Sequence, residues 1–337
     1  MRWLKRLLVV LIIFIVAFGA YAYFQMADYY PSTDDAYVHT HVVNVVPRVT
    51  GHIVAIYVHD NQPVTAGQPL LKIDPLPYQY ALEQATAELA QTQRQTASIA
   101  ADIAQARANL AADEVNFSNA QRNAQRAAAL ATQKYLSAQQ ADNAQTTARA
   151  ARAHANADAA ALAQAEAQQT LNGAHIEAAQ AAVRTAQLNL SWTLISAPMN
   201  GVVSKVDKIH VGDVATANTA LFPLIGNQVY WVDANYKETD LGRMRVGQPA
   251  KVLVDMYPNH AFQGVVESFS GGAGNAFSLL PPENATGNWV KVTQRVPVRI
   301  LIKDPSRDYP LRIGTSATVT VDTGGAPGWV RTLQRIL

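Results

Sequence analysis

The sequence predicts an α+β protein with a transmembrane helix at its N-terminus, a β-sandwich that is split by an inserted antiparallel α-helical coiled-coil hairpin, and a C-terminal β-barrel. Three observations predict this order. An alanine-rich stretch from Pro77 to Pro198 contains no further proline and only one glycine, Gly173. A similar β-type pattern stands on each side of that stretch, and short β-type runs separated by turn residues follow it. Alanine loses no side-chain entropy in a helix and buries little apolar surface, so the long stretch predicts extended helices rather than a globular core.

Residues 1–27 are predicted to form a short cytoplasmic segment and a membrane anchor. Residues 7–24 are an uninterrupted run of 18 apolar and small residues, preceded by three basic residues, Arg2, Lys5 and Arg6. As a helix the run is roughly 27 Å long, enough to cross a bilayer, and the basic residues orient the N-terminus toward the cytoplasm. The alternative is a cleaved signal peptide, because Ala20-Tyr21-Ala22 matches the small-x-small cleavage pattern. Both predict export, and the anchor predicts a single-pass inner-membrane protein with its bulk in the periplasm of a Gram-negative bacterium.

The composition argues against several functions. A net charge of +2 with 15% charged residues argues against nucleic-acid binding, and the absence of cysteine removes disulfides, thiol chemistry and thiolate metal sites. The sequence holds no nucleophile motif, phosphate-binding loop or paired-carboxylate arrangement. His39 and His41 would share one face of a strand near Asp34 and Asp35, but a metal site needs three or four converging ligands. We therefore expect no enzymatic activity, no cofactor and no metal.

The β-type pattern that precedes the alanine-rich stretch recurs after it. The copy that begins at Gly51 and the copy that begins at Gly201 both have apolar residues 13 and 20 positions later, namely Val64 and Leu71, and Val214 and Leu221. Each copy is too small to bury a face alone, so the two are expected to pack into one small β-sandwich. Residues 28–75 then hold a barrel-entry strand and the first half, residues 192–228 hold the second half, and residues 76–191 are the insertion.

The insertion carries two series of seam residues typical of a coiled coil. In the first helix the a and d positions are Leu82, Leu89, Thr96, Ile103, Leu110, Phe117 and Ala124, with Ala85, Thr92, Ile99, Ala106, Asp113, Ala120 and Ala127. In the second helix they are Ala141, Ala148, Ala155, Leu162, Gln169, Ile176, Val183 and Leu190, with Ala144, Ala151, Asp158, Ala165, Asn172, Ala179 and Ala186. Bulky seam residues near both bases predict an antiparallel hairpin that turns around residues 131–137. A single helix in a parallel dimer would not return the chain to its second β-half.

Individual hairpin residues carry further expectations. Ser137 fits the N-cap of a capping box with Gln140 at the start of the return helix. Gly173 costs about 1 kcal/mol relative to alanine in a helix interior, so a kink or break is expected there. Asp113 and Asp158 are polar residues on the seam, and they are expected to fix the register or to find a local partner.

Two β-halves around a helical insertion resemble the lipoyl/biotinyl fold cut open at its hairpin, as in the membrane fusion proteins of the HlyD superfamily. This resemblance implies a split lipoyl-like β-sandwich. In carrier versions of the fold the hairpin presents a lysine for lipoic acid or biotin. The insertion replaces that hairpin here and no residue matches the lysine, which leaves a lipoyl or biotinyl carrier subunit as a remote alternative.

The C-terminal third predicts a small antiparallel β-barrel over residues 229–323, followed by a tail at residues 324–337. Its strand-like runs are Ala250–Val254, Gly264–Phe269, Val290–Ile302 and Ser316–Val321. Two segments here, Trp231–Gln248 and Gly274–Val298, resemble the barrel of the EmrA-type periplasmic adaptors of that superfamily. Asp34–Val38 completes the resemblance, which then covers nearly the whole chain, and in that family this segment leads into the barrel region.

The resemblance to EmrA-type adaptors implies partners in two membranes. It implies an adaptor that links an inner-membrane transporter to a TolC-like outer-membrane channel for the efflux of drugs or other small molecules, and that self-associates into a funnel-shaped oligomer. Only 16 residues follow Val321, too few for the membrane-proximal domain of resistance-nodulation-division adaptors, so the expected transporter belongs to the major facilitator superfamily. The alternative within the superfamily is an adaptor of an ABC-driven type I protein secretion system.

Three residues near the hairpin turn are the predicted channel contacts. Arg126, Leu130 and Ser137 resemble in their spacing the tip motif by which such adaptors dock onto TolC-like channels. The alternative makes Arg126 a solvated charge, Leu130 a seam residue and Ser137 only a helix cap.

A second predicted contact lies in a loop flanked by glycines and prolines. Its apolar residues are Phe277, Leu279 and Leu280. They are expected to contact the transporter, the membrane surface or a neighbouring adaptor. The alternative is that they fold over the mouth of the barrel as part of its core.

Overall fold

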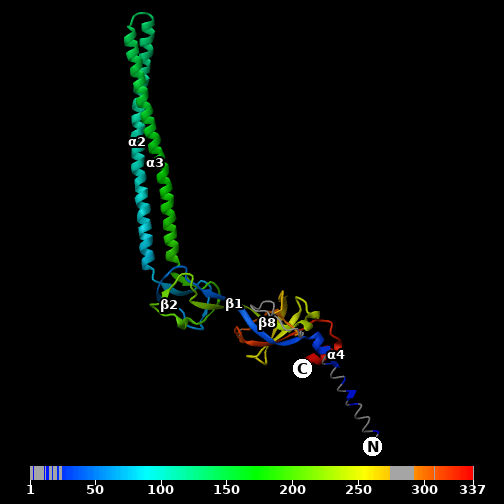
Figure 1. Cartoon of the computed structure of the whole chain (residues 1–337). Coiled ribbons are helices and arrows are strands. Elements are labelled where there is room, and N and C mark those ends of the chain that lie inside the picture. Colours follow the sequence, from blue (N-terminus) through cyan, green and yellow to red (C-terminus); the bar gives the residue numbers. More distant parts are fainter. Residues whose placement is uncertain are drawn as a thin grey trace, which may run out of the picture.

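The computed structural model describes residues 25–273, 292–306 and 308–336, together with residues 3, 11, 13, 14, 17, 21 and 22. Phe277, Leu279 and Leu280 and most of the predicted anchor at residues 7–24 lie outside these ranges. Within the described ranges, no helix combines the length and the apolar character that crossing a membrane requires. The molecule consists of a helical hairpin, a small β-sandwich at its base and a β-barrel beyond the sandwich (Figure 1).

Six antiparallel strands close into the barrel. They are β1 (Ser32–Val45), β8 (Phe222–Lys237), β9 (Pro249–Val254), β10 (Ala261–Phe269), β11 (Arg295–Ile302) and β12 (Ser316–Val321). Their order is β1-β12-β9-β10-β11-β8, and a direct pairing of β1 with β8 closes the ring. The predicted barrel and the entry of Asp34–Val38 into it are confirmed. β11 begins at Arg295, and residues 292–294 before it are not in a strand; Val290, the predicted start of this strand, lies outside the described residues.

The barrel interior is filled by every second residue of its strands. In the barrel part of β8 the buried residues are Tyr230, Val232, Ala234 and Tyr236, and those of β9 and β12 alternate in the same way. A strand directs successive side chains to opposite faces, so this period of two places one apolar row inside and one polar row outside. A short 3₁₀ helix, η2 (Glu238–Arg243), follows β8 at the rim.

The β-sandwich is assembled from strands on both sides of the insertion. Its strands are β2 (Gly51–Ile56), β3 (Pro63–Val64), β4 (Pro69–Ile73), β5 (Leu194–Ser196), β6 (Gly201–Val203) and β7 (Val214–Ala215), with the 3₁₀ helix η1 (Val206–Lys208). β2 pairs with β7 and β3 pairs with β6, so each half completes the sheet of the other. Apolar residues of both halves, among them Ile53, Leu71 and Val203, share one core, which confirms the predicted packing.

The two glycines that mark the repeat stand where strands approach closely. A Cβ atom at Gly51 would lie 2.7 Å from Cγ2 of Ile73, and a Cβ atom at Gly201 would overlap the carbonyl oxygen of Ile225. Only glycine leaves room for such an approach. The repeated glycine therefore reflects the same packing requirement in both halves.

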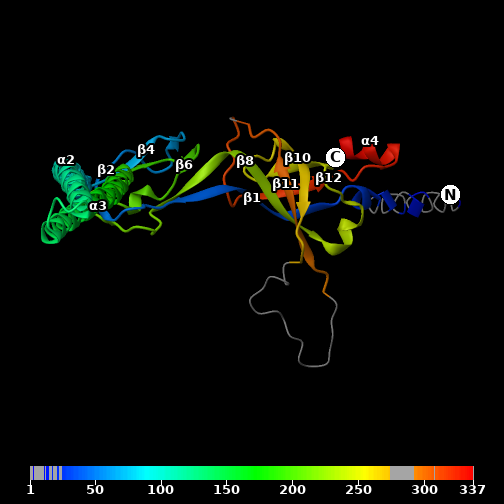
Figure 2. The ribbon, with the colours of Figure 1, turned by 90° about the horizontal axis from the view of Figure 1, so that it is seen from above.

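β1 and β8 form a two-stranded ribbon that joins the barrel to the sandwich (Figure 2). Residues Ala36–Thr40 of β1 pair with β8 in the barrel, and Val42–Val45 pair with it in the sandwich, with a register shift between the two parts. At the shift the Thr40 hydroxyl donates to the carbonyl oxygens of Gly226 and Val229. This side chain thus satisfies backbone groups that lose their partners in the irregular ladder.

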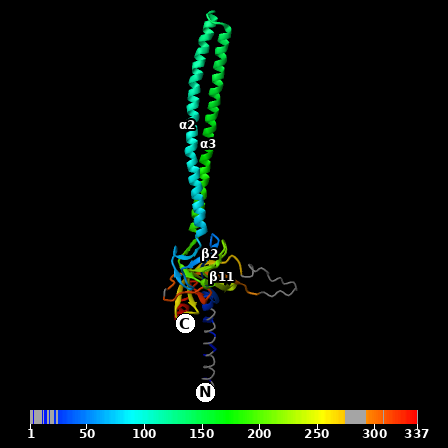
Figure 3. The ribbon, with the colours of Figure 1, turned by 90° about the vertical axis from the view of Figure 1, so that its left-hand side faces the viewer.

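The insertion forms the predicted antiparallel hairpin of α2 (Leu76–Thr132) and α3 (Ala138–Ser191) (Figures 1 and 3). At 57 and 54 residues, the helices are about 85 Å and about 80 Å long. Every predicted seam residue is buried or half-buried except Gln169, which is exposed. The heptad register is therefore confirmed over nearly its whole length.

Two expectations for single hairpin residues have different outcomes. α3 runs unbroken through Gly173, so the predicted break is wrong. Glycine, unlike proline, keeps its backbone N–H, and seam contacts of the adjacent Asn172 with α2 hold the helix in place. Asp113 has the expected local partner, since the Asn116 amide donates to its carboxylate over 3.2 Å.

The residues predicted as a C-terminal tail include a helix, α4 (Gly328–Ile336). Val330 is fully buried there and packs in a small cluster with Tyr30 and Ala326. α4 lies beside residues 26–30, at the end of the barrel away from the sandwich (Figures 1 and 2).

Candidate functional site at the hairpin tip and on the barrel face

The hairpin tip is a tight connection between α2 and α3. Lys134 adopts a left-handed conformation with φ of 65°, and its N–H donates to the carbonyl of Ala131 over 3.0 Å. The N–H of Tyr135 donates to the carbonyl of Leu130 over 3.0 Å, which satisfies another free carbonyl at the end of α2. The turn thus pairs the last carbonyl groups of α2 with its own N–H groups.

Ser137 caps the return helix as predicted. Its hydroxyl oxygen accepts a hydrogen bond from the N–H of Gln140 over 3.3 Å, and the Gln140 side-chain oxygen accepts one from the N–H of Ser137 over 3.3 Å. These reciprocal bonds satisfy two of the backbone donors left free at a helix start. The hydroxyl of Ser137 is exposed, so the cap also leaves it within reach of a partner.

Arg126 and Leu130 lie one turn apart on the outer surface of α2. Arg126 is exposed and donates to the side-chain oxygen of Asn123 one turn earlier. Leu130 is 43% exposed, because the neighbouring seam positions are taken by Ala127 and Ala131. The alternative that Leu130 fills the seam is therefore wrong, and an apolar side chain stands beside a positive charge near the tip.

Tyr135 is a tip residue that the sequence analysis missed. It is 79% exposed and lies in the turn between the two helices. A tyrosine in a short turn between two helices could have indicated an exposed contact residue, because a large aromatic ring has no core to enter there. Together with Leu130 it gives the tip an apolar surface flanked by charge.

A shallow groove of about 590 Å³ runs between the helices just below the tip. Six of its fourteen lining residues are alanines from both helices, and Phe117 on α2 and Arg149 and Arg152 on α3 also line it. Small seam residues leave this space because alanine does not fill the distance between two helices. The groove adds a concave surface beside the exposed tip residues.

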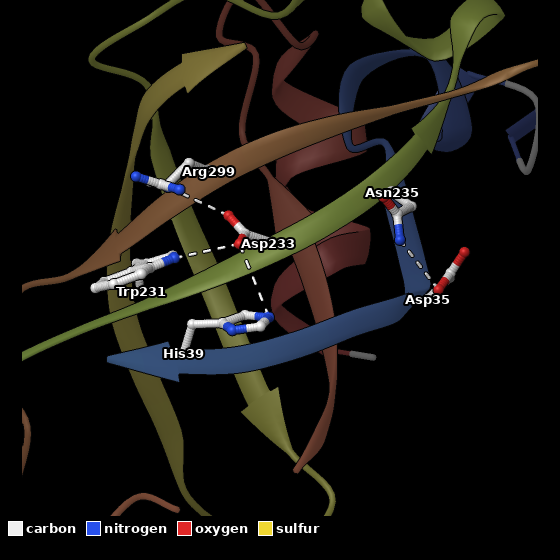
Figure 4. A network of polar contacts seen from close by, with 6 residues as sticks. All are labelled: Asp35, His39, Trp231, Asp233, Asn235 and Arg299. Carbon is white, nitrogen blue, oxygen red and sulfur yellow. Dashed lines mark hydrogen bonds and ion pairs between the residues drawn. The ribbon is translucent and has the colours of Figure 1, made fainter. Parts of the chain in front are cut away.

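A polar network covers one outer face of the barrel, across β1, β8 and β11 (Figure 4). The carboxylate of Asp233 accepts hydrogen bonds from Nε of Arg299 and from Nε1 of Trp231, both over 3.2 Å, and lies 3.8 Å from Nε2 of His39. The guanidinium group of Arg299 lies 4.8 Å from the centre of the Trp231 ring. His41 contacts the same ring edge-on, with ring centres 5.0 Å apart.

A second set of the same network joins the start of β1 to β8 and β11. Asp35 accepts from the amide of Asn235 over 3.2 Å and forms an ion pair with Arg295 over 3.1 Å. His39 and His41 do share one face of β1, as predicted, but both lie beside Trp231. Among the described residues, no three histidine, aspartate or glutamate side chains converge as metal ligands would. This network ties three strands together by side-chain contacts.

Two family models match the chain in succession. The model described as "RND MFP, barrel-sandwich hybrid domain" matches residues 41–225, and the model described as "AAEA-like beta-barrel domain" matches residues 229–322. The multidrug export protein EmrA of Haemophilus influenzae is 35% identical over 96% of this chain and 85% of its own length. The chain belongs to the EmrA-type membrane fusion proteins.

Other relatives are consistent with this family. The fatty acid resistance protein FarA of Neisseria gonorrhoeae is 36% identical over 87% of this chain and 76% of its own length. The crystal structure of MacA from Actinobacillus actinomycetemcomitans covers 87% of this chain and 78% of its own, with a TM-score of 0.56 at 20% identity. At that identity the likeness concerns the fold alone. Members of this family are adaptors that link other proteins rather than enzymes.

Proposed function

We propose that the protein is a periplasmic adaptor that links an inner-membrane transporter to a TolC-like outer-membrane channel for the efflux of drugs or other small molecules. The observation that carries this proposal is the hairpin, whose two helices of about 80 Å end in an exposed tip. The names of the relatives support it, since one is a multidrug export protein and another confers fatty acid resistance.

The arrangement of the parts supports a bridging role. Residues 25–31, which follow the proposed anchor, lead into β1 of the barrel, whereas the tip lies at the far end of the hairpin (Figures 1 and 3). If residues 7–24 anchor the chain in the inner membrane, the tip stands far out in the periplasm. The two-helix hairpin is stable without a globular core because α2 and α3 bury their seam residues against each other. In this role the protein transports nothing itself and depends on the energy of the transporter.

The tip is proposed to bind the channel through Arg126, Leu130 and Ser137. Arg126 offers a charged donor, Leu130 an exposed apolar contact, and Ser137 an exposed hydroxyl at the start of α3. Such a combination of an apolar contact flanked by polar groups is typical of an interface that forms between preformed surfaces.

Cysteine crosslinking tests this docking cleanly, because the chain has no cysteine of its own. Arg126→Cys and Ser137→Cys are each produced together with an outer-membrane channel and treated with a thiol crosslinker. We expect both to crosslink to the channel. Glu83→Cys, at the exposed base of α2, is the matched control and is expected to remain uncrosslinked. Equal crosslinking from Glu83 and from the tip contradicts the docking proposal.

The inner-membrane partner and the oligomer are tested by purification. We expect a transporter of the major facilitator superfamily to copurify with the full chain from inner membranes, and chemical crosslinking to trap oligomers of the adaptor. Copurification of an ATP-binding cassette protein instead contradicts this choice of transporter and favours type I secretion.

A further inference from the structure

The C-terminal helix α4 is fixed to the chain that leads out of the proposed anchor. The ring of Tyr21 stacks on that of Trp329, with centres 6.1 Å apart and an angle of 21° between the planes. Thr323, just before α4, donates from its backbone N–H (3.1 Å) and its hydroxyl (2.8 Å) to the carbonyl of Tyr29. Val330 packs against Tyr30 in the same small core. Two segments about 300 residues apart in the sequence thus form one unit.

The barrel holds this unit from the other side. Arg243 of η2 forms an ion pair with Asp28 over 2.9 Å, and its guanidinium group lies 4.4 Å from the centre of the Tyr29 ring. Gln248, immediately before β9, donates to the carbonyl of Thr323 over 2.9 Å. The position of α4 relative to the end of the N-terminal apolar run is therefore fixed by contacts with that segment and by contacts with the barrel.

If residues 7–24 span the membrane, α4 lies at the level of the membrane–water interface. Tyr21 lies in the last turn of the apolar run at residues 7–24, so the stacked Trp329 lies at the same level. Trp329 remains 37% exposed, and tryptophan and tyrosine are the residues that concentrate at the membrane–water interface. The position of Trp329 beside the end of the apolar run agrees with this preference.

The charge of the segment matches an anionic lipid surface. Residues 328–337 contain two arginines and no acidic residue, and Arg331 and Thr332 are exposed. Basic residues are attracted to an anionic lipid surface, and aromatic side chains with a polar group are favoured at its headgroup level.

We propose that α4 is a second membrane contact, which lies on the outer surface of the inner membrane with Trp329 among the lipid headgroups and Arg331 at the phosphates of anionic phospholipids. The inference rests on the anchor of the proposed function. One helix crossing a bilayer leaves the attached domain free to rotate and tilt. A second contact beside it orients the barrel, and with it the hairpin, relative to the membrane.

Single-cysteine spin labels on the full chain in vesicles test this inference. Labels are placed at Thr332→Cys on α4, at Ile13→Cys in the apolar run and at Glu83→Cys at the hairpin base. For each label, accessibility to oxygen, which concentrates in the bilayer, is compared with accessibility to a water-soluble nickel chelate. Vesicles contain phosphatidylcholine with or without phosphatidylglycerol.

We expect the oxygen-to-nickel ratio at Thr332 to lie between those at Ile13 and Glu83, and to rise when phosphatidylglycerol is present. Arg331→Gln is expected to abolish that rise, and Trp329→Ala to lower the ratio toward that at Glu83. A bilayer value at Ile13 with a water value at Thr332 overturns the inference and leaves the proposed anchor standing. A water value at Ile13 overturns the anchor and the inference together.

Discussion

Asn172 of α3 donates a hydrogen bond across the hairpin to the hydroxyl oxygen of Thr96 on α2, over 2.9 Å. Asn172 is only 3% exposed and occupies a d position of the seam. The same amide also donates to the backbone carbonyl of Thr92 over 3.5 Å. A buried amide with both partners on the facing helix favours a single alignment of two alanine-rich helices, whose many small seam residues would otherwise fit in several registers. The contact therefore links the register of α2 to that of α3.

Replacing this amide is expected to destabilise the hairpin. Asn172→Ala removes the interhelical hydrogen bond and leaves a gap at the seam, so we expect a loss of about 1 to 2 kcal/mol in the free energy of unfolding. Urea unfolding followed by far-ultraviolet circular dichroism measures it, because the long helices dominate that signal.

The control for this change is the exposed ion pair between the same helices. Arg107 and Glu166 lie 2.9 Å apart, but both side chains are largely in solvent. Arg107→Gln is expected to cost less than about 1 kcal/mol. Equal losses in the two variants contradict a special role for Asn172.

The neighbouring Gly173 is expected to tolerate alanine. A Cβ atom there meets nothing within 4 Å, and the residue lies in the interior of an unbroken helix. Gly173→Ala is therefore expected to stabilise α3 by about 0.5 to 1 kcal/mol through helix propensity and the smaller entropy of the unfolded chain. The same urea titration checks it, and a lower midpoint than in the unaltered protein contradicts the open surroundings of Gly173.

The hairpin could be predicted in detail because its determinants are local. A seven-residue period fixes which side chains of α2 and α3 face each other, and the seam from Leu82 to Ala186 follows it. The register even places Leu130 outside the seam, so its exposure could have been derived from the positions of Ala127 and Ala131. The role of Ser137 as a helix cap could also be predicted, because a capping box is encoded within four residues.

Contacts between distant segments could not be read from the sequence. The polar network on the barrel joins Asp35, Asp233 and Arg299, whose alignment depends on the register of three strands in a closed ring. The crossed pairing of β2 with β7 and of β3 with β6 follows from packing of the two halves rather than from either half alone. α4 was missed because nine residues give too short a periodic signal, and its partners lie at the opposite end of the chain.

Because two strands approach closely at Gly201, adding a single methyl group there is expected to destabilise the protein. Gly201→Ala forces the new methyl group against the carbonyl oxygen of Ile225 on β8, which is backbone and cannot move aside cheaply. We expect a loss of about 1 to 3 kcal/mol, seen as a lower midpoint of thermal unfolding. Gly271→Ala is the matched control, because a Cβ atom there meets nothing within 4 Å. Similar midpoints for both variants contradict the steric reason for the repeated glycine.

Tyr236 gives the barrel a dependence on alkaline pH. Its ring is fully buried and its hydroxyl donates to the carbonyl of Val319 over 2.8 Å. Burial, with a smaller contribution from the negative charge of Asp240, raises the pKa of Tyr236 above its ordinary value. Below about pH 10 the tyrosine is neutral in both the folded and the unfolded chain. The contribution of Tyr236 to the free energy of unfolding is therefore fully present there and does not change with pH. Above pH 10 only the unfolded chain releases the proton, so this residue lowers the free energy of unfolding by about 1.4 kcal/mol per pH unit.

Tyr236→Phe separates the hydrogen bond from the titration. At neutral pH the variant is expected to be about 1 kcal/mol less stable, because the buried carbonyl of Val319 loses a donor. Above about pH 10 the difference between the two proteins is expected to shrink and then reverse, because phenylalanine has no proton to release in the unfolded state. Urea unfolding at a series of alkaline pH values measures this. Parallel stability curves for the unaltered protein and Tyr236→Phe would show that burial does not hold the proton on Tyr236.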